Sequence, residues 1–480
     1  MIRLWLRLRE SRIGRIVLYG STRSVGEALL GLRGVLLAGL LGPEAFGIWA
    51  LFRMVLTYAN FAGLGLVRGL ELEVAKTRAD RDGARRIPWG RTAVGCELVI
   101  FGGVAILALI AGGVTDTPWL RQLLWAVAAG LLPDRLWAYC LTYLRAAGSL
   151  RDFALLELTQ FVAQIVLTLA LAQFFGLDGA FAGFALALMS LLLAVRSRVP
   201  LQPQLDRLRI ETLLTVGLPL SVTQLLSAML ATVDRLAVGA WLGLAALGQY
   251  AFAVSVASLG VTAALVVQTV VFPDVYRRLE RDGAGEVNRK HLDRTIRTFA
   301  LVLAPLAGAG VLVLGLVIAR LLPQYTAAVQ PASVFVFAGV AQGVVGLCMV
   351  SVVAGRRQKV LPLFTLAALL ANAASAYATL ALGYGMAGLA IGAVVARLIY
   401  AGGVVALVAA GAAMHPFATA VKVLWPIAWC TAAIAVVSGL IPVRDPASFA
   451  LALAAYLALL GPIYVALARA HWARVQISGR

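Results

Sequence analysis

Charged side chains inside long apolar stretches are the residues of this sequence with the clearest capacity for chemistry. A charge at the centre of a lipid bilayer costs at least about 2.5–3.5 kcal/mol, so such a residue faces a protein interior or a water-filled cavity. There it marks the path of an ion or a substrate. The set includes Arg23, Glu27, Arg33, Arg53, Arg68, Asp134, Arg135, Glu157, Asp234, Arg235 and Arg397.

The apolar stretches make up most of the chain. Of its 480 residues, 61% are hydrophobic and 13% are charged, and the mean hydropathy is +0.91. Soluble domains contain roughly 45–50% apolar and about 25% charged residues. The composition excludes a soluble globular protein, a disordered chain and a disulfide scaffold, and it predicts an all-α polytopic membrane protein.

Segments of about 20 apolar residues, the length that crosses a bilayer as a helix, divide the chain into fourteen predicted spans. They lie near 14–41, 47–73, 92–113, 122–144, 153–174, 179–196, 210–241, 248–273, 298–320, 331–354, 360–382, 386–412, 419–441 and 447–468. The short turns near 175–179 and 383–386 are the least distinct breaks. A twelve-span arrangement would merge or lose one pair.

The basic residues predict the orientation. With the N-terminus inside, 31 of the 41 Lys and Arg residues fall in cytoplasmic segments and three in outer turns. This is a strong positive-inside bias, and it predicts that both termini are cytoplasmic. It also accounts for most of the net charge of +19 without a nucleic-acid partner. The basic segments are therefore expected to set topology first and to contact anionic lipids second.

Enzyme chemistry has little support in the sequence. The four cysteines lie far apart in apolar stretches, the three histidines are equally scattered, and no phosphate-binding loop of the G-x-x-x-x-G-K-[ST] type occurs. All loops are short, and no signal peptide is expected at the N-terminus. We therefore expect no catalytic residues, no metal site, no cofactor and no enzymatic activity.

An internal repeat relates the two halves of the chain. The segment from Leu41 to Ala50 aligns with the segment from Leu242 to Ala251 at an offset of 201 residues, and both contain a pair of glycines. Each copy is predicted to be a tight outer turn whose paired glycines supply backbone freedom. Six spans per half give a parallel repeat, an arrangement found in transporters. Chance similarity of two glycine-rich turns is the alternative.

The repeat predicts three regions: a six-helix lobe over 1–208, a second six-helix lobe over 209–412, and two additional spans over 413–480. A central cavity is expected between the lobes.

Several motifs resemble a known family. They are Leu41 to Ala50, Gly63-Leu64-Gly65-Leu66, Gly217-Leu218-Pro219-Leu220, Asp234-Arg235 and Leu242 to Tyr250. These motifs resemble helices 1, 2 and 7 of the Wzx-like polysaccharide flippases, a branch of the multidrug/oligosaccharidyl-lipid/polysaccharide (MOP) exporter superfamily. The motifs cover only about 80 residues, and Pro219 has no proline counterpart in the first half.

The resemblance implies two six-helix bundles with two extra helices. It implies that the protein moves an isoprenoid-diphosphate-linked oligosaccharide across a bacterial inner membrane by alternating access, with H⁺ or Na⁺ as a coupling ion. Polysaccharide-assembly proteins would be further partners.

Polar faces on several spans then suggest which residues contact such a substrate. Apart from Lys422 near the start of the span 419–441, the basic residues inside the spans are arginines, whose planar guanidinium groups bind phosphate oxygens bidentately. The predicted diphosphate contacts are Arg23, Arg53, Arg235 and Arg33. The predicted glycan contacts are Thr57, Asn60, Gln160, Gln164 and Gln224, with Tyr139 and Tyr143 as stacking faces. The candidates for ion coupling are Glu157, Asp134 and Glu27.

Structural roles are the alternative for several of these charges. Arg68 and Arg397 are expected to extend toward a membrane face. Asp134 and Arg135 are adjacent and are expected to find separate partners on neighbouring helices. Asp234 could connect span 7 to span 8 or to span 1.

Two other functions compete with the flippase. A cation-coupled multidrug or metabolite antiporter of the same superfamily would have twelve spans and fewer arginines in its cavity. A membrane-embedded polymerase or glycosyltransferase would need a large outer loop or an acidic catalytic pair, and the short outer turns count against it.

Overall fold

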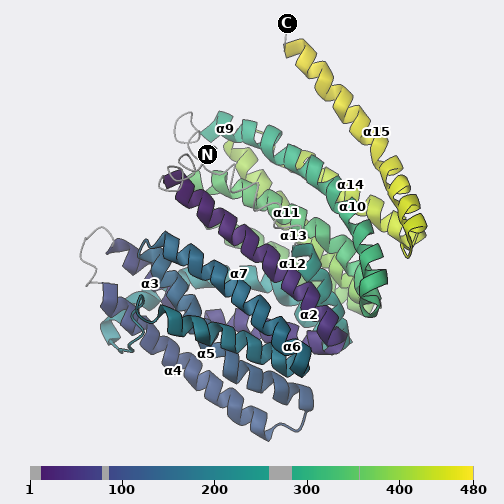
Figure 1. The fold of residues 1–480 in the computed structure, drawn as a ribbon. Coiled ribbons are helices and arrows are strands. Elements are labelled where there is room, and N and C mark those ends of the chain that lie inside the picture. Colours follow the sequence, from purple (N-terminus) through teal and green to yellow (C-terminus); the bar gives the residue numbers. More distant parts are fainter. Residues whose placement is uncertain (1–11, 78–85, 259–283, 356, 479–480) are drawn as a thin grey trace, which may run out of the picture. The chain divides into compact units, whose positions relative to one another are not determined.

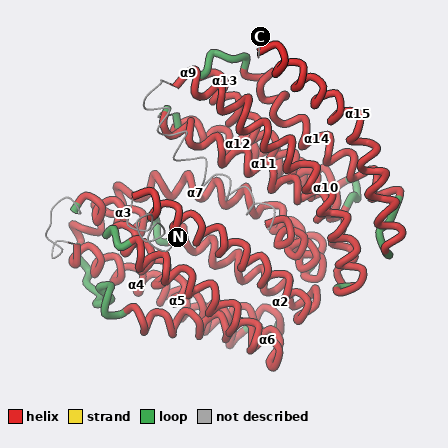
Figure 2. Tube along the Cα trace, turned by 45° about the horizontal axis from the view of Figure 1, so that its top comes forward, coloured by secondary structure: helices red, strands yellow, loops and turns green. Residues whose placement is uncertain are grey.

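The computed structural model describes residues 12–77, 86–258, 284–355 and 357–478. Side chains are described within these ranges except at 12–25, 27, 220, 223, 284, 354 and 466–478. The side chains of Arg23 and Glu27 therefore lie outside the described part, and the predicted span 248–273 is described only as far as residue 258. Every regular element of the described residues is a helix (Figure 2). The prediction of an all-α protein is confirmed.

The chain divides into two compact units, Met1–Ala251 and Phe252–Arg480. The first contains α2 (Arg12–Ala62), α3 (Leu66–Lys76), α4 (Ile87–Val114), α5 (Pro118–Ala146), α6 (Leu150–Val195) and α7 (Arg207–Leu242) (Figure 1). The second contains α9 (Ala284–Lys290), α10 (Arg297–Leu321), α11 (Val329–Ala354), α12 (Leu361–Ala381), α13 (Gly385–Gly411), α14 (Pro416–Leu440) and α15 (Pro446–Ser478). A π-helix, His291–Ile296, joins α9 to α10, and short 3₁₀ helices at Pro323–Ala328 and Gln358–Val360 precede α11 and α12.

The helices coincide with the fourteen predicted spans. Ten of those in the described residues are long and apolar enough to cross a membrane. Two of the ten, α2 and α6, each join two helices across a kink and so correspond to two predicted spans. The kinks are at Gly42 and Gly176, where φ is 73° and 57°. With α5 and the shorter apolar helix Leu244–Ser258, a helix lies at each predicted position. The break near 175–179 is real, and so is the break near 383–386, which separates α12 from α13.

The two turns of the internal repeat have the same backbone geometry. Gly42 ends the first half of α2 with a φ of 73°, and Gly243 ends α7 with a φ of 86°. Side chains rarely tolerate this region, so glycine is the residue that permits each turn. The prediction of glycine-dependent turns is therefore confirmed for this pair.

The second glycine of each turn has a different role. Gly47 and Gly248 lie inside helices, and a Cβ atom on Gly47 would lie 2.1 Å from the carbonyl oxygen of Leu244. A Cβ atom on Gly248 would lie 1.7 Å from the carbonyl oxygen of Pro43. The two helices thus pack backbone against backbone at repeat-related positions. For these two glycines, close packing is the requirement, and the predicted role in turn flexibility is wrong.

One predicted span is interrupted. The prediction of a single helix over 47–73 is wrong, because α2 ends at Ala62 and α3 begins at Leu66. In between, Leu64 and Gly65 both have positive φ, 49° and 86°. A hydropathy pattern does not register this change of direction, since the residues on both sides of it are apolar.

The second unit is built on a core shared by α10, α11, α13, α14 and α15. Two tyrosines of α15 attach it to α10: the Tyr456 hydroxyl donates to the carbonyl oxygen of Pro305 at 3.4 Å, and that of Tyr464 donates to Leu301 at 2.9 Å. The two C-terminal helices that lie outside the repeat are therefore packed into this unit.

Candidate functional site

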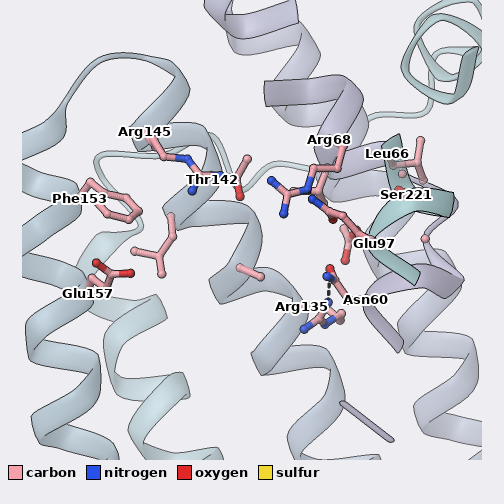
Figure 3. Close-up of a pocket in the computed structure, with 16 residues that line it drawn as sticks. Asn60, Leu66, Arg68, Glu97, Arg135, Thr142, Arg145, Phe153, Glu157 and Ser221 are labelled. Carbon is pink, nitrogen blue, oxygen red and sulfur yellow. Dashed lines mark hydrogen bonds between the residues drawn. The ribbon is translucent and has the colours of Figure 1, made fainter. Parts of the chain in front are cut away.

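A polar pocket lies inside the first unit, among α3, α4, α5, α6, α7 and the end of α2. Its volume is about 230 Å³. It is lined by Asn60, Gly63, Gly65, Leu66, Val67, Arg68, Glu97, Arg135, Ala138, Leu141, Thr142, Arg145, Phe153, Glu157, Ser221 and Gln224 (Figure 3). Three arginines and two glutamates are among them, so we call it the arginine pocket.

The break between α2 and α3 positions one wall of the pocket. Gly65 packs so closely on α7 that an added Cβ atom would lie 2.4 Å from the carbonyl carbon of Gly217. Its left-handed conformation and this contact both require glycine. The new direction taken by α3 brings Arg68 to the pocket, where its Nε donates to Gln224 Oε1 of α7 at 3.1 Å.

Two of the three arginines share one carboxylate. Arg68 Nη1 lies 2.9 Å from Glu71 Oε2, and Arg145 Nη2 lies 3.0 Å from Glu71 Oε1. Both oxygens of Glu71 are thus engaged by guanidinium groups from different helices, α3 and α5. Such pairing offsets the cost of placing the three charges in an apolar surrounding. Arg68 was expected to extend toward a membrane face; in this structure its guanidinium contacts Gln224 and Glu71.

The third arginine is held by its neighbour in sequence. Arg135 donates through Nε to Asp134 Oδ2 at 3.2 Å and forms a second, shorter bond to the same oxygen through Nη2. Its Nη1 donates to Asn60 Oδ1 of α2 at 2.8 Å. The prediction that Asp134 and Arg135 find separate partners is wrong for Asp134, because long side chains allow adjacent residues to meet although their Cβ atoms diverge.

Glu97 of α4 is the most enclosed carboxylate of the pocket. Its exposed fraction is 2%, and its Oε2 has no hydrogen-bond partner among the described residues. Its Oε1 lies against the break, 3.5 Å from where a Cβ atom on Gly63 would be. In Figure 3 it lies with Arg68, Asn60 and Arg135 in one group, apart from Arg145 and Glu157. A buried carboxylate with an unsatisfied oxygen is suited to gain and lose a proton.

The pocket includes three of the residues predicted from the sequence. Asn60 and Gln224 line it as expected for substrate contacts, and Glu157, a predicted coupling residue, is 7% exposed in its wall. Asp134 lies behind it, bonded to Arg135.

Other predicted residues lie elsewhere in the first unit. Arg33 is 5% exposed and donates to Gln164 Oε1 at 3.0 Å, with its guanidinium 5.5 Å from the centre of the Trp49 ring. The Arg53 guanidinium lies 5.2 Å from the centre of the Phe184 ring. Both arginines therefore face an aromatic cluster formed by Trp49, Phe52, Phe181 and Phe184.

Hydrogen bonds occupy the remaining predicted polar residues. The Thr57 hydroxyl donates to the carbonyl oxygen of Arg53 at 2.9 Å, and Gln160 Oε1 accepts from Trp137 Nε1 at 2.6 Å. Tyr139 and Tyr143 were expected as stacking faces. Tyr139 is fully buried and Tyr143 is 7% exposed, so neither ring is presented to a substrate in this structure.

Asp234 connects α7 to the following helix. It is fully buried and accepts a hydrogen bond of 3.1 Å from the hydroxyl of Tyr250, while its other oxygen accepts from the backbone N–H of Arg235. Of the two structural roles expected for Asp234, the structure thus supports the connection of span 7 to span 8. In the second unit, Arg397 donates to the carbonyl oxygen of Ala393 and lies 5.5 Å from the Phe335 ring centre.

Sequence reasoning did not identify Glu97, Arg145 and Thr142 as pocket residues. Glu97 could have been predicted from the sequence, because it is a carboxylate inside the predicted span 92–113. Arg145 lies just past the end of span 122–144 and gave none. No group of three or more His, Cys, Asp or Glu side chains in the described residues could hold a metal ion.

Comparison with known proteins identifies the family. Residues 36–330, more than half of the chain, match the family model described as polysaccharide biosynthesis protein. The chain belongs to this family. No curated protein sequence matches it.

Solved structures show the same fold for this family member. An inward-facing multidrug resistance MATE family transporter of the MOP superfamily matches with a TM-score of 0.61 at 17% identity, covering 85% of this chain and 95% of its own. The lipid II flippase MurJ in an inward closed conformation matches with a TM-score of 0.61 at 14% identity, covering 94% and 99%. An outward-facing MATE family transporter matches with a TM-score of 0.51 at 18% identity, covering 88% and 97%.

These matches confirm the MOP fold and the resemblance to Wzx-like proteins. By the length and composition of its helices the chain is a multi-pass membrane protein, and it shares its fold with solved transporters and a solved flippase.

Proposed function

We propose that the protein is a flippase that moves an isoprenoid-diphosphate-linked oligosaccharide or polysaccharide precursor across the bacterial inner membrane by alternating access. In this proposal both termini are cytoplasmic, and transport is coupled to H⁺ or Na⁺. Membrane lipids surround the protein, and polysaccharide-assembly proteins are its partners. The match to a polysaccharide biosynthesis family supports a role in polysaccharide synthesis. The arginines of the arginine pocket support binding of the substrate's diphosphate group.

The observation that carries the proposal is the sharing of Glu71 by Arg68 and Arg145. A carboxylate bound by two guanidinium groups from two helices occupies a position that a phosphate group could take, since phosphate accepts the same bidentate bonds. Exchange of Glu71 for a diphosphate would preserve the pairing of both arginines. The substrate would enter by replacing a carboxylate and would leave as that carboxylate returns.

In the same proposal, neighbouring polar side chains contact the glycan part of the substrate. Asn60 and Gln224 line the pocket, with Thr57, Gln160 and Gln164 as further contacts proposed along the same helices. Arg23, Arg53 and Arg235 remain proposed contacts for the diphosphate. Arg33, which donates to Gln164 and lies near the Trp49 ring, is a fourth proposed contact.

Ion coupling belongs to the carboxylates of the first unit. Glu157 lines the arginine pocket, Asp134 is bonded to Arg135, and Glu27 is a third candidate. To these we add Glu97, because one of its buried oxygens is unpaired among the described residues.

A flipping assay tests this function. The purified protein is placed in liposomes with a fluorescent isoprenoid-diphosphate oligosaccharide, and movement between leaflets is followed with an impermeant quencher. The double variant Arg68→Gln, Arg145→Gln should slow flipping at least about tenfold, because each charge-assisted hydrogen bond is worth about 1.5–3 kcal/mol. Arg121→Gln, near Trp125 and outside the pocket, is the control and should flip at the wild-type rate.

The competing function has a distinct outcome. A multidrug or metabolite antiporter would change drug sensitivity in cells while leaving lipid-linked glycans unaltered. If the double variant flips the lipid at the wild-type rate, the arginine pocket does not contact the substrate.

A further inference from the structure

A second pocket lies in the second unit, where α9, α11 and α13 meet. Its volume is about 160 Å³, and it is lined by residues that include Asn288, Ser351, Arg357 and Gly411. Val352, Leu407 and Val408 provide an apolar part of its wall. Because α11 ends at Ala354 and α13 at Gly411, the pocket is at the end of two membrane-spanning helices, the depth of lipid headgroups. We call it the headgroup pocket.

Two buried polar atoms in this pocket lack partners. Asn288 is 5% exposed and Ser351 is 4% exposed, and neither Asn288 Oδ1 nor Ser351 Oγ has a hydrogen-bond partner among the described residues. An unsatisfied buried polar group costs about 1–3 kcal/mol, so native proteins fill such positions with a water or a ligand. The two residues are 63 positions apart in sequence and converge on one cavity, which indicates a built site.

The local helix geometry is also unusual. Residues His291–Ile296 form a π-helix directly after α9, and π-turns are frequent at functional sites. The turn is attached to α11 by His291, which is 2% exposed and whose Nε2 lies 3.0 Å from the carbonyl oxygen of Leu347. Asn288 lies one turn earlier, so this widened segment sets its position over the pocket.

The headgroup pocket has a positively charged side and a partially negative side. Arg357 is exposed at the rim, and its Nη1 donates to the carbonyl oxygen of Leu407 at 3.3 Å. A guanidinium has five N–H groups, and this bond engages one nitrogen. The ends of α11 and α13 supply the opposite pole, because the last carbonyls of a helix carry a partial negative charge. Asn288 Oδ1 is a further acceptor.

We infer that this pocket binds the phosphoethanolamine headgroup of a membrane phospholipid. The phosphodiester accepts hydrogen bonds from Arg357 and from the hydroxyl of Ser351. The ammonium group donates to Asn288 Oδ1 and is attracted by the carbonyl ends of α11 and α13. Val352, Leu407 and Val408 form the apolar side of the pocket against which the headgroup carbons lie. The site lies in the other unit from the arginine pocket and is independent of the flipping proposal.

Headgroup chemistry provides the first test. Full-length protein is purified in detergent, stripped of lipid and titrated with short-chain phosphatidylethanolamine, phosphatidylcholine or phosphatidylglycerol, with thermal stabilisation as the measurement. Phosphatidylcholine has the same phosphodiester but no N–H donor, so it should bind at least about tenfold more weakly than phosphatidylethanolamine. Equal stabilisation by all three lipids, or by none, would overturn the assignment and leave water as the occupant. Preference for phosphatidylglycerol would overturn it as well.

Variants provide the second test. Arg357→Gln is at an exposed position and should fold normally, and it should weaken stabilisation by all three lipids, because each carries the phosphodiester that Arg357 binds. Asn288→Leu should remove the distinction between ethanolamine and choline. Arg289→Gln, which lines a neighbouring hollow and not this pocket, is the matched control and should retain the preference. Stabilisation of Arg357→Gln by phosphatidylethanolamine to the wild-type extent would refute the site, and so would an ethanolamine preference that survives in Asn288→Leu.

The source of the headgroup is tested separately. Soluble phosphoethanolamine, added over the same range of concentrations, should stabilise the protein much less than the lipid, since it lacks acyl chains. Equal stabilisation by the soluble compound would show that the pocket takes a free metabolite and would overturn the lipid assignment.

Discussion

At the residue scale, the arginine pocket is defined by how each positive charge is paired. Arg135 is held within its own helix by Asp134, whereas Arg68 and Arg145 depend on a single carboxylate, Glu71. The first pair is local and needs no other helix. The second arrangement connects α3 to α5, so its rearrangement would change contacts between helices. Under the proposed function, substrate binding at Glu71 would therefore change the contact between these two helices.

Glu71→Gln distinguishes substrate exchange from a merely structural ion pair. If the diphosphate replaces Glu71, removing the carboxylate removes its competitor, so the lipid-diphosphate should bind several-fold more tightly and be released more slowly. Binding is measured by titration with the fluorescent lipid, and turnover by the flipping assay. Without ligand, the variant should melt at a lower temperature, because two arginines lose their partner. Weaker binding in Glu71→Gln would contradict the exchange.

Glu97→Gln tests which carboxylate couples transport to an ion. A carboxamide keeps the size of the side chain but cannot release a proton. An imposed pH gradient should therefore drive flipping in wild-type protein and have no effect in the variant, while flipping without a gradient continues. The assay is run in liposomes with and without the gradient. Glu44→Gln, at an exposed position near the first turn, is the control, and a variant at position 97 that still responds to the gradient would exclude Glu97.

At the element scale, helix contacts in the first unit depend on glycine pairs. Gly47 and Gly248 allow repeat-related helices to touch through their backbones, and Gly65 and Gly217 do the same for α3 and α7. Small residues at such crossings are a general feature of membrane helix packing.

Two glycine variants separate close packing from helix propensity. Gly248→Ala places a Cβ atom 1.7 Å from the carbonyl oxygen of Pro43, so we expect a loss of about 1–3 kcal/mol or more from overpacking. Gly102→Ala, in α4, meets nothing within 4 Å and should stabilise the helix by about 0.5–1 kcal/mol. Thermal melting in detergent measures both. Equal melting temperatures for the two variants would contradict the packing role.

The elements and the pocket differ in how far the sequence predicts them. Spans follow from the number of consecutive apolar residues, which is why even the short break near Gly176 was predicted. The break at Leu64 and Gly65 depends on backbone torsion angles in an apolar run, and composition does not encode it. Asn60, Gln224 and Glu157 were predicted because they are polar within spans. Arg68 and Glu71 are three positions apart on one helix, a spacing that helix periodicity places on one face. The contact of Arg145 of α5 with Glu71 of α3 joins residues 74 positions apart, and helix periodicity within one span carries no information about it.

At the scale of the whole molecule, the positive-inside bias makes a testable statement about orientation. The turn between α4 and α5 and the turn between α14 and α15 should face outward, while the segment before α7 should face the cytoplasm. The four native cysteines are all buried, so single cysteines can be introduced into the otherwise wild-type chain with low background labelling.

Asp116→Cys and Arg444→Cys should react with a membrane-impermeant maleimide in intact spheroplasts, because both residues lie in the outward turns. Arg207→Cys, whose wild-type side chain is 93% exposed, should react only after lysis. Labelling is quantified on the purified protein by mass spectrometry, and denatured samples give the maximum for each position. An even number of spans separates the turn at residue 116 from that at 444, so both must react on the same side. Reaction of Arg207→Cys in intact spheroplasts would reverse the orientation, and reaction of only one of the two outer positions would require an odd number of spans between them.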